Sequence, residues 1–214
     1  MNQELKKRIL TSIFLIILLF LMVYYNYIFV ISIIIISVIT WVEFNFLIFK
    51  IYKNKLLRFV ICFLILSYIT LFAVFLAYGF LSESQNSKIY ILYLIGVCVV
   101  TDIGGYVFGK IFKGKKLSKI SPNKTISGSI GSFLLSFIFM VIISSILSYD
   151  FIIQLTVITL LVSLSSQLGD LFISYLKRKA KVKNTSNILP GHGGVLDRID
   201  GIIFAVPFGV IISS

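Results

Sequence analysis

The chain contains few of the side chains that bind metals and nucleotides in many enzymes. Of its 214 residues only one is histidine, His192, and only two are cysteine, Cys62 and Cys98. A multi-histidine metal site is therefore excluded, and no CxxC pair or Cys/His spacing supports zinc. Both cysteines fall inside apolar stretches, so we expect buried free thiols that pack as small hydrophobic side chains. The GxxxxGK[ST] pattern of a P-loop is absent as well.

Charge is also scarce. Charged residues make up 13% of the chain and hydrophobic residues 58%. A soluble domain of this length could not bury so much apolar surface, and several apolar runs exceed the roughly 18–20 residues that cross a bilayer as a helix. The sequence therefore predicts an all-α, polytopic integral membrane protein. We expect one membrane domain over 1–214, with N-terminal spans over 1–100 and a catalytic half over 101–214.

The apolar runs predict seven spans with short connections. They lie at 9–25, 27–49, 56–81, 89–109, 128–148, 151–176 and 199–214. The turn between the first two is very tight, and the last span is short enough to tilt, to cross only part of the bilayer or to thin it. At the N-terminus, a basic flank and a long apolar run indicate a first transmembrane helix rather than a signal peptide.

Lysine and arginine predict the orientation. With the N-terminus inside, the segments 1–8, 50–55 with Arg58, 110–127 and 177–198 carry 3, 4, 6 and 6 of the 20 Lys/Arg residues, and only Lys88 lies outside. This one-sidedness follows the positive-inside rule, so we expect the N-terminus and both large basic loops in the cytosol and the C-terminus outside. Topology thus accounts for the net charge of +12, and no nucleic-acid partner is expected.

Three carboxylates, Glu43, Asp102 and Asp170, fall within predicted spans. A charge at the bilayer centre costs about 2.5–3.5 kcal/mol, so such residues are usually paired or functional. Each lies two helical turns before a lysine that ends its span, so we expect all three just beneath the cytosolic surface. Context favours a structural role for Glu43, hydrogen bonded to a neighbouring helix. It favours a functional role for Asp102, in a glycine-rich stretch, and above all for Asp170, in the polar run SSQLGD.

The two basic loops are where a soluble anion would meet the chain. Residues 110–127 mix lysine with Ser, Thr and Gly, whose backbone amides can cradle phosphate oxygens. Lysines that only hold topology or bind anionic lipid explain that loop equally well. Residues 177–201 add six cations, the only histidine and two aspartates, Asp197 and Asp200. Hard carboxylate oxygens near so many cations favour a Mg²⁺–phosphate site over zinc, and His192, in LPGHGG, is expected to contact a ligand.

Three sequence blocks resemble one known family. SxxKR at Ser174–Arg178, then Lys183 and LPGHGGVLDRID at Leu189–Asp200, closely resemble the signature of phosphatidate cytidylyltransferases, also called CDP-diacylglycerol synthases. SPNKTISGSIG at 121–131 and DIGGYVFGKIFKGKKLS at 102–118 are similar to two further blocks of that family. Together they cover about half the chain, from Asp102 onward, whereas the first hundred residues resemble the family only as generic spans.

The resemblance implies a reaction and a cellular place. Phosphatidate and CTP would give CDP-diacylglycerol and pyrophosphate in phospholipid biosynthesis, with Mg²⁺ as cofactor and a second cation left open. The enzyme would lie in the bacterial inner membrane, with its active site facing the cytosol, and many lipid enzymes of this size form homodimers. Anionic membrane lipid would be its surroundings as well as its substrate.

The resemblance also implies roles for individual residues. Asp170 and Asp197 would be the best metal ligands, with Asp102 as a further candidate. Catalytic roles would fall on Asp170, Lys177, Arg178, Asp197, Arg198 and Asp200. Substrate contacts would come from Ser121, Lys124, Thr125, Ser174, Lys183, Gly191, His192, Gly193 and Gly194. Two positions depart from the family: Asn184 and Ser127 stand where relatives usually carry Asp and Glu.

Three other functions remain open at this point. One is a cytidylyltransferase for another lipid phosphate, such as a polyprenyl or archaeal-type lipid. A second is an inactive relative that only binds anionic lipid, which Asn184 and Ser127 would support. The third is an ion-coupled transporter or channel that uses the three membrane acids and has little need of the HGG–DRxD run.

Overall fold

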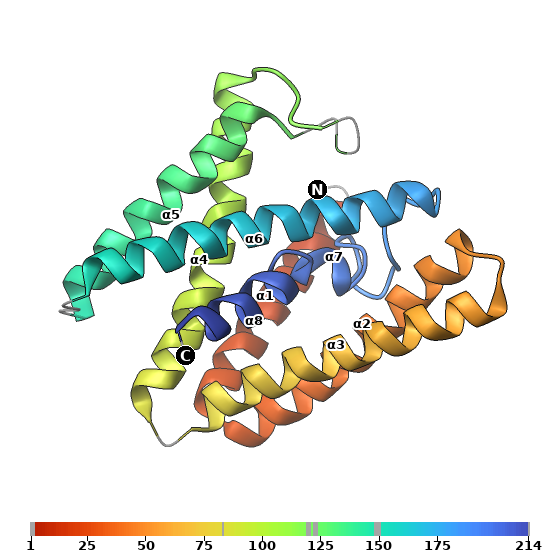
Figure 1. Ribbon diagram of the computed structural model, residues 1–214, viewed down its shortest axis with the longest axis horizontal. Coiled ribbons are helices and arrows are strands. Elements are labelled where there is room, and N and C mark those ends of the chain that lie inside the picture. Colours follow the sequence, from red (N-terminus) through yellow and green to blue (C-terminus); the bar gives the residue numbers. More distant parts are fainter. Residues whose placement is uncertain (1–2, 83, 119–120, 122–123, 148–150, 214) are drawn as a thin grey trace. The chain divides into compact units, whose positions relative to one another are not determined.

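The computed structural model describes residues 3–82, 84–118, 121, 124–147 and 151–213 (Figure 1). Regular structure in this part of the chain is helical, apart from the isolated bridges Lys116–Thr125 and Leu189–Gly193. The helices are α1 (Gln3–Tyr24), α2 (Asn26–Ile51), α3 (Lys55–Leu81), α4 (Gln85–Phe112), α5 (Ile126–Leu147), α6 (Ile152–Lys179), α7 (Leu196–Ile199) and α8 (Ile202–Ser213). The predicted all-α class is confirmed.

Five of the described helices, α2 to α6, are long and apolar enough to cross a membrane. Two shorter apolar helices, Arg8–Tyr24 and Ile202–Ile212, correspond to the first and last predicted spans. The chain is thus a polytopic membrane protein, and each predicted span coincides with a helix. Residues 148 and 214, the predicted ends of two spans, lie outside the described residues. The count of seven crossings and their orientation stay predictions.

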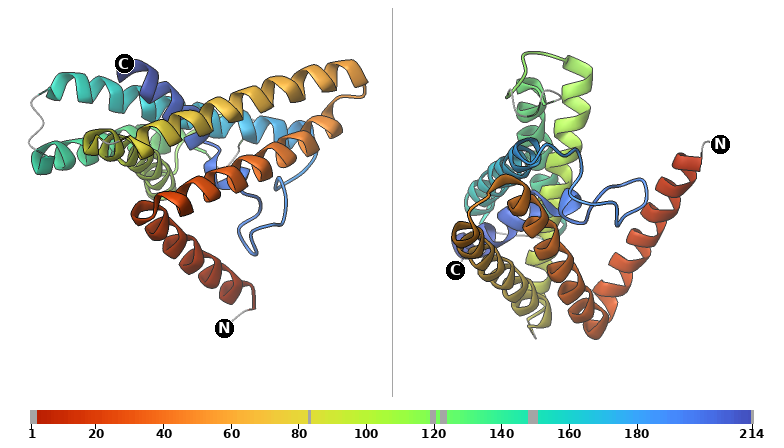
Figure 2. Two further views of the ribbon diagram at one scale, coloured as in Figure 1. Left: turned by 90° about the horizontal axis from the view of Figure 1, so that it is seen from below. Right: turned by 90° about the vertical axis from the view of Figure 1, so that its right-hand side faces the viewer.

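Two short turns each contain a residue with extended backbone directly before the next helix. Tyr25, at φ −118° and ψ 108°, is the only residue between α1 and α2, and the two helices diverge sharply there (Figure 2). Asn54 starts α3, because its side-chain oxygen accepts hydrogen bonds from the backbone of Leu56 at 2.9 Å and Leu57 at 3.4 Å. Asparagine is a preferred N-cap because it satisfies amides that the first helical turn leaves unpaired.

The residues group into two compact units, each built from segments far apart in the sequence. The first unit comprises residues 1–83 and 176–199, and the second comprises 84–175 and 200–214. In the first, Phe29 of α2 stacks on Phe80 of α3 with ring centroids 3.9 Å apart. In the second, Tyr93 of α4 stacks on Phe139 of α5 at 5.9 Å. The single membrane domain and its division near residue 100 stay predictions.

Candidate functional site

In the second unit, α4 and α5 pack so closely that their backbones are in van der Waals contact. A Cβ on Gly104 would lie 2.6 Å from the carbonyl oxygen of Gly131, and one on Gly128 would lie 2.6 Å from that of Gly105. Glycine is therefore required at these positions, which explains the glycines of the DIGGYVFG and SGSIG stretches. Across the same seam, the buried Ser132 hydroxyl donates to the Thr101 carbonyl at 2.7 Å.

The loop between α4 and α5 folds back on itself. Lys113, at φ 45°, and Gly114, at φ 117°, reverse the chain. The amide of Leu117 then donates to the Lys124 carbonyl at 2.8 Å. Thr125 closes the loop as an N-cap, because its hydroxyl accepts the Gly128 amide at 3.1 Å. This hydrogen bond satisfies an amide that the first turn of α5 would otherwise leave unpaired.

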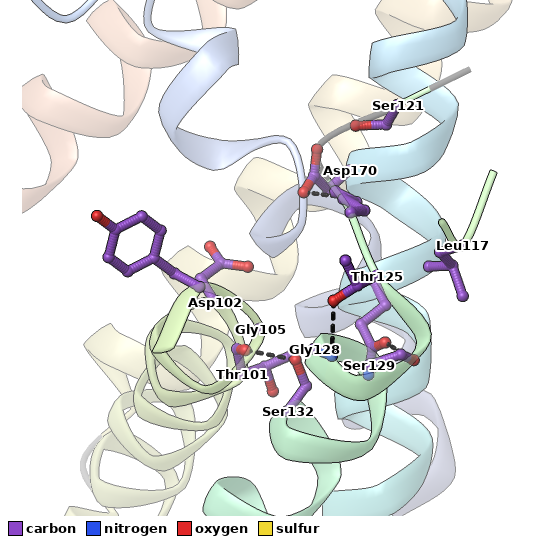
Figure 3. A pocket seen from close by; sticks show the side chains of 13 residues that line it. Thr101, Asp102, Gly105, Leu117, Ser121, Thr125, Gly128, Ser129, Ser132 and Asp170 are labelled. Carbon is purple, nitrogen blue, oxygen red and sulfur yellow. Dashed lines mark hydrogen bonds and ion pairs between the residues drawn. The ribbon is translucent and has the colours of Figure 1, made fainter. Parts of the chain in front are cut away.

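A cavity of about 310 Å³ opens between α4, this loop, α5 and α6 (Figure 3). Its polar lining includes Thr101, Asp102, Ser121, Lys124, Thr125, Ser129, Ser132, Gln167 and Asp170. The Lys124 ammonium forms an ion pair with the Asp170 carboxylate, and both side chains keep about a quarter of their surface exposed, at 28% and 26%. Asp170 also accepts a long hydrogen bond, 3.3 Å, from Ser174.

This lining can bind an anion and a cation at once. Carboxylate and hydroxyl oxygens are the ligands that Mg²⁺ prefers, while an ammonium and the N-terminal end of a helix attract phosphate. Among the described residues, no group of three or more His, Cys, Asp or Glu could hold a metal by itself. Two carboxylates without a complete protein cage suit Mg²⁺, which usually keeps waters and shares phosphate oxygens.

In the first unit, Asp197 organises the loop that follows α6. Its Oδ1 accepts the Lys177 ammonium at 2.7 Å, and its Oδ2 accepts the amides of Thr185 at 2.9 Å and Gly194 at 3.0 Å. Burial raises the pKa of Asp197, but the hydrogen bonds from Lys177, Gly194 and Thr185 and the charge of Lys177 outweigh it, so the pKa is lowered below its ordinary value. Asp197 therefore stays an anion held by its own loop.

The glycine-rich turn at 189–193 is closed by backbone hydrogen bonds. The amides of His192 and Gly193 donate to the Leu189 carbonyl at 2.9 and 3.1 Å. Gly191 and Gly193 have φ values of 76° and 88°, a conformation that favours glycine. Arg198 clamps the turn from the side, because its Nη2 donates to the His192 carbonyl at 2.8 Å.

Helix α1 contacts the tip of this turn. The Thr11 hydroxyl donates to the Pro190 carbonyl at 3.0 Å, and the Ser12 hydroxyl lies 3.3 Å from His192 Nε2. Within the described part of the chain, His192 Nδ1 is buried and has no hydrogen-bond partner. The only histidine is thus packed against the first helix on one side and retains one unused nitrogen.

The predicted site residues fall into two groups. The cavity of the second unit brings together Asp102, Ser121, Lys124, Thr125 and Asp170. The loop of the first unit brings together Lys177, Gly191, His192, Gly193, Gly194, Asp197 and Arg198. Arg178 and Lys183 are exposed. Asp200, in the second unit, accepts the neighbouring Gly201 amide at 3.0 Å.

The two departures from the family motif both lie beside residues of the predicted site. Asn184 is exposed on the loop, and a Cβ on Gly193 would lie 3.3 Å from its Cγ. The Ser127 hydroxyl lies 3.0 Å from that of Thr125, beside the start of α5.

Sequence reasoning missed several polar residues that the structure adds to both groups. In the cavity these are Thr101, Ser129 and Gln167, with Ser129 donating to the Gln167 side-chain oxygen at 2.5 Å. Gln167 could have been found, because it lies nearly one helical turn before Asp170 in the same polar run. In the loop, the missed residues are Thr185 and Ser186, which contact Glu43.

The fold and the cavity define a polytopic membrane protein with a pocket suited to a phosphorylated ligand and a hard cation. The chain belongs to the cytidylyltransferase family, because the sequence model described as "Cytidylyltransferase family" matches residues 1–214.

Several bacterial proteins named phosphatidate cytidylyltransferase are similar to it. That of Bacillus subtilis (strain 168) is 40% identical over 149 residues, which cover 66% of this chain and 55% of that protein. That of Staphylococcus haemolyticus (strain JCSC1435) is 41% identical over 130 residues, 60% of this chain and 50% of that protein. The protein of Staphylococcus aureus (strain COL) is 42% identical over 137 residues, 62% and 52% respectively. The chain spans about half the length of the curated relatives it matches.

Proposed function

We propose that this chain transfers a cytidylyl group from CTP to phosphatidate and so forms CDP-diacylglycerol and pyrophosphate. The cavity of the second unit carries the proposal, because it joins Lys124 and Asp170 beside the capped start of α5. Family membership and the names of relatives that are about 40% identical support the same reaction.

The chemistry needs little beyond positioning and neutralisation of charge. A phosphate oxygen of phosphatidate attacks the α-phosphorus of CTP, a new P–O bond forms, and the bond to the β-phosphate breaks as pyrophosphate leaves. The attacking oxygen is already anionic at neutral pH, so no general base is required. Lys124 would bind phosphate oxygens, while the hydroxyls of Ser121 and Thr125 would orient them.

The residues present fit Mg²⁺ as the cofactor. Asp102 and Asp170 would hold the ion, and the hydroxyl-rich lining supplies further hard oxygens. When bound, Mg²⁺ neutralises charge that develops on the phosphates during the transfer. Asp197, predicted with Asp170 as one of the two best metal ligands, belongs to the other compact unit. Its role in metal binding remains a prediction, as do a second cation, catalytic roles for Arg178 and Asp200, and substrate contacts from Ser174 and Lys183.

We further propose seven membrane crossings with the N-terminus in the cytosol of a bacterium, so that both basic loops face the compartment that contains CTP. Placement in the inner (plasma) membrane of a bacterium agrees with the bacterial origin of the relatives. The homodimer stays a prediction.

A cysteine introduced at Lys115 should react with an impermeant reagent only from the cytosolic side, and labelling from outside would overturn this topology.

The reaction is tested by giving the purified chain CTP, Mg²⁺ and one lipid phosphate at a time. Phosphatidate should yield CDP-diacylglycerol and pyrophosphate, whereas polyprenyl phosphate and an archaeal-type lipid phosphate should yield much less. Preference for either of these would replace phosphatidate as the substrate. No product with any lipid, from folded protein, would overturn the transferase and leave an inactive lipid-binding relative or a transporter.

A further inference from the structure

The buried carboxylate of Glu43 lies outside the cavity and has no part in the chemistry above. Only 2% of this residue's surface is exposed. The sequence predicted hydrogen bonds to a neighbouring helix, and Glu43 accepts the amides of Val195, which precedes α7, and Leu196, which begins it, about 150 positions further along the chain. A helix partner is therefore found in α7, further contacts come from the loop before it, and a structural role for Glu43 stays a prediction.

Four loop groups donate hydrogen bonds to this one carboxylate. Oε1 accepts the Ser186 hydroxyl at 2.5 Å and the Val195 amide at 3.0 Å. Oε2 accepts the Thr185 hydroxyl at 2.7 Å and the Leu196 amide at 2.8 Å. The ion pairs among the described residues do not include Glu43. An ionised carboxylate only accepts hydrogen bonds, so four donors match it without a cation.

The same carboxylate explains a glycine of the HGG motif. A Cβ on Gly194 would lie 2.5 and 2.6 Å from the two Glu43 oxygens and would also overlap the Thr185 hydroxyl. The neighbouring Gly193 is restricted in the same way by Asp197, whose Oδ2 would lie 2.8 Å from a Cβ. Both glycines are therefore required where a carboxylate packs against the loop backbone, in addition to any contact with a ligand.

Glu43 is also linked to Asp197. The Thr185 hydroxyl lies 2.7 Å from Glu43 Oε2 and 3.1 Å from Asp197 Oδ2. One hydroxyl proton therefore serves two carboxylates, one from α2 and one from α7. Through Asp197 the connection continues to the ammonium of Lys177 at 2.7 Å.

We propose that Glu43 is a positioning residue for the proposed cytidylyltransferase. Its carboxylate holds the loop at Thr185–Leu196, and through it Asp197 and Lys177, in one conformation. This inference rests on the proposed function for its catalytic consequence, but not for the contacts themselves. Positioning partners of this kind typically contribute tenfold to a hundredfold in activity or affinity.

Glu43→Gln is the sharpest variant, because it keeps the volume of the side chain and replaces one oxygen with an amide NH₂. Each Glu43 oxygen accepts one hydroxyl and one backbone amide. The hydroxyl that faces the new NH₂ group can rotate and accept a hydrogen bond from it. The backbone amide that faces it, of Val195 or Leu196, can only donate and loses its partner. Thr40→Val is the matched control. Thr40 is buried one turn earlier on α2, and its hydroxyl has no hydrogen-bond partner among the described residues.

The first measurement is hydrogen–deuterium exchange of a peptide covering 193–199, which does not depend on any activity. Glu43→Gln should raise its exchange about tenfold, as expected for the loss of one or two hydrogen bonds, and leave the start of α5 unchanged. Thr40→Val should match the wild type. Unchanged exchange in Glu43→Gln would overturn the inference whether or not the chain turns over CTP.

The second measurement is turnover with CTP and phosphatidate. Glu43→Gln should lower kcat/KM tenfold to a hundredfold, while Thr40→Val should retain it. If Glu43→Gln raises the exchange but leaves kcat/KM normal, Glu43 holds the loop but the conformation of the loop does not matter for turnover. This result would overturn the catalytic part of the inference. If Glu43→Gln does not fold, Thr185→Val should show the same losses and Thr185→Ser should restore them. Absence of turnover in the wild type would contradict the proposed function. The hydrogen–deuterium exchange of Glu43→Gln would still test whether Glu43 holds the loop.

Discussion

Asp170 and Asp197 are both aspartates that pair with a lysine, yet their surroundings differ. The Asp170 side chain is 26% exposed in a cavity, and beyond Lys124 it accepts one long hydrogen bond from Ser174. The Asp197 side chain is 6% exposed, and its oxygens accept two backbone amides as well as Lys177. A carboxylate with spare acceptor capacity can exchange partners with a ligand, whereas one filled by its own backbone holds a conformation.

The largest expected effect concerns Asp170, the more exposed of the two aspartates. Asp170→Asn should reduce formation of CDP-diacylglycerol at least about 100-fold, because it removes a charge that the proposed Mg²⁺ needs. Its thermal stability should change little, since a partly exposed ion pair contributes about 0–1 kcal/mol. Activity and melting are measured on the same preparation. Near-normal turnover would place the chemistry elsewhere.

Asp197→Asn should show the opposite balance. Its NH₂ group would face either Lys177 or two backbone amides, so we expect a loss of about 1–3 kcal/mol in the free energy of unfolding. Activity should fall only as far as the loop loosens. A variant that melts like the wild type but loses all turnover would instead make Asp197 a metal ligand, as the family resemblance implies.

The pH dependence of that stability provides a separate test. The pKa of Asp197 is lower in the folded chain than the ordinary value of 3.8. Its contribution is therefore complete above pH 3.8 and is lost as the pH falls through the lower native pKa. Melting curves of wild type and Asp197→Asn should differ near neutrality and converge below pH 3.8. A constant difference across this range would show that the carboxylate charge is not what stabilises the loop.

Lys124 should have a smaller effect. Lys124→Ala removes one charge-assisted contact to phosphate and should raise the KM for a phosphate substrate about tenfold, with stability nearly unchanged. Lys124→Arg should recover part of the loss because it keeps the charge. Equal KM values in all three proteins would remove Lys124 from the binding site.

The smallest expected effect concerns a departure from the family motif. Asn184→Asp restores the acid that relatives usually carry, at an exposed position where substitutions change free energies by about 0.5 kcal/mol or less. Turnover should therefore change by about twofold or less. A gain of tenfold or more would show that this loop lacks a catalytic acid. Position 184 would then have to be compared with Asp170 and Asp197 as a third acidic position.

The helices could be predicted from the sequence because each apolar run is long enough to require one. Asp170 could be singled out because a carboxylate in an apolar helix is costly and because this one lies in the polar run SSQLGD. The partner of Glu43 could not be predicted, because Thr185 and Ser186 look like ordinary loop residues and nothing local connects them with α2. The close approach of the glycines of α4 and α5 could not be predicted either, because which backbone atoms meet there depends on tertiary packing.

The seam between α4 and α5 has a consequence for motion. Where side chains meet, a cavity wall can yield on the picosecond to nanosecond scale as rotamers change, but backbone packed on backbone has no rotamers to change. Gly104 against Gly131 and Gly128 against Gly105 leave no such slack beside the cavity. That wall can therefore rearrange only if whole helices shift, on the microsecond to millisecond scale, so ligands of different size must be accommodated by the loop and by side chains of α6 and not by the seam.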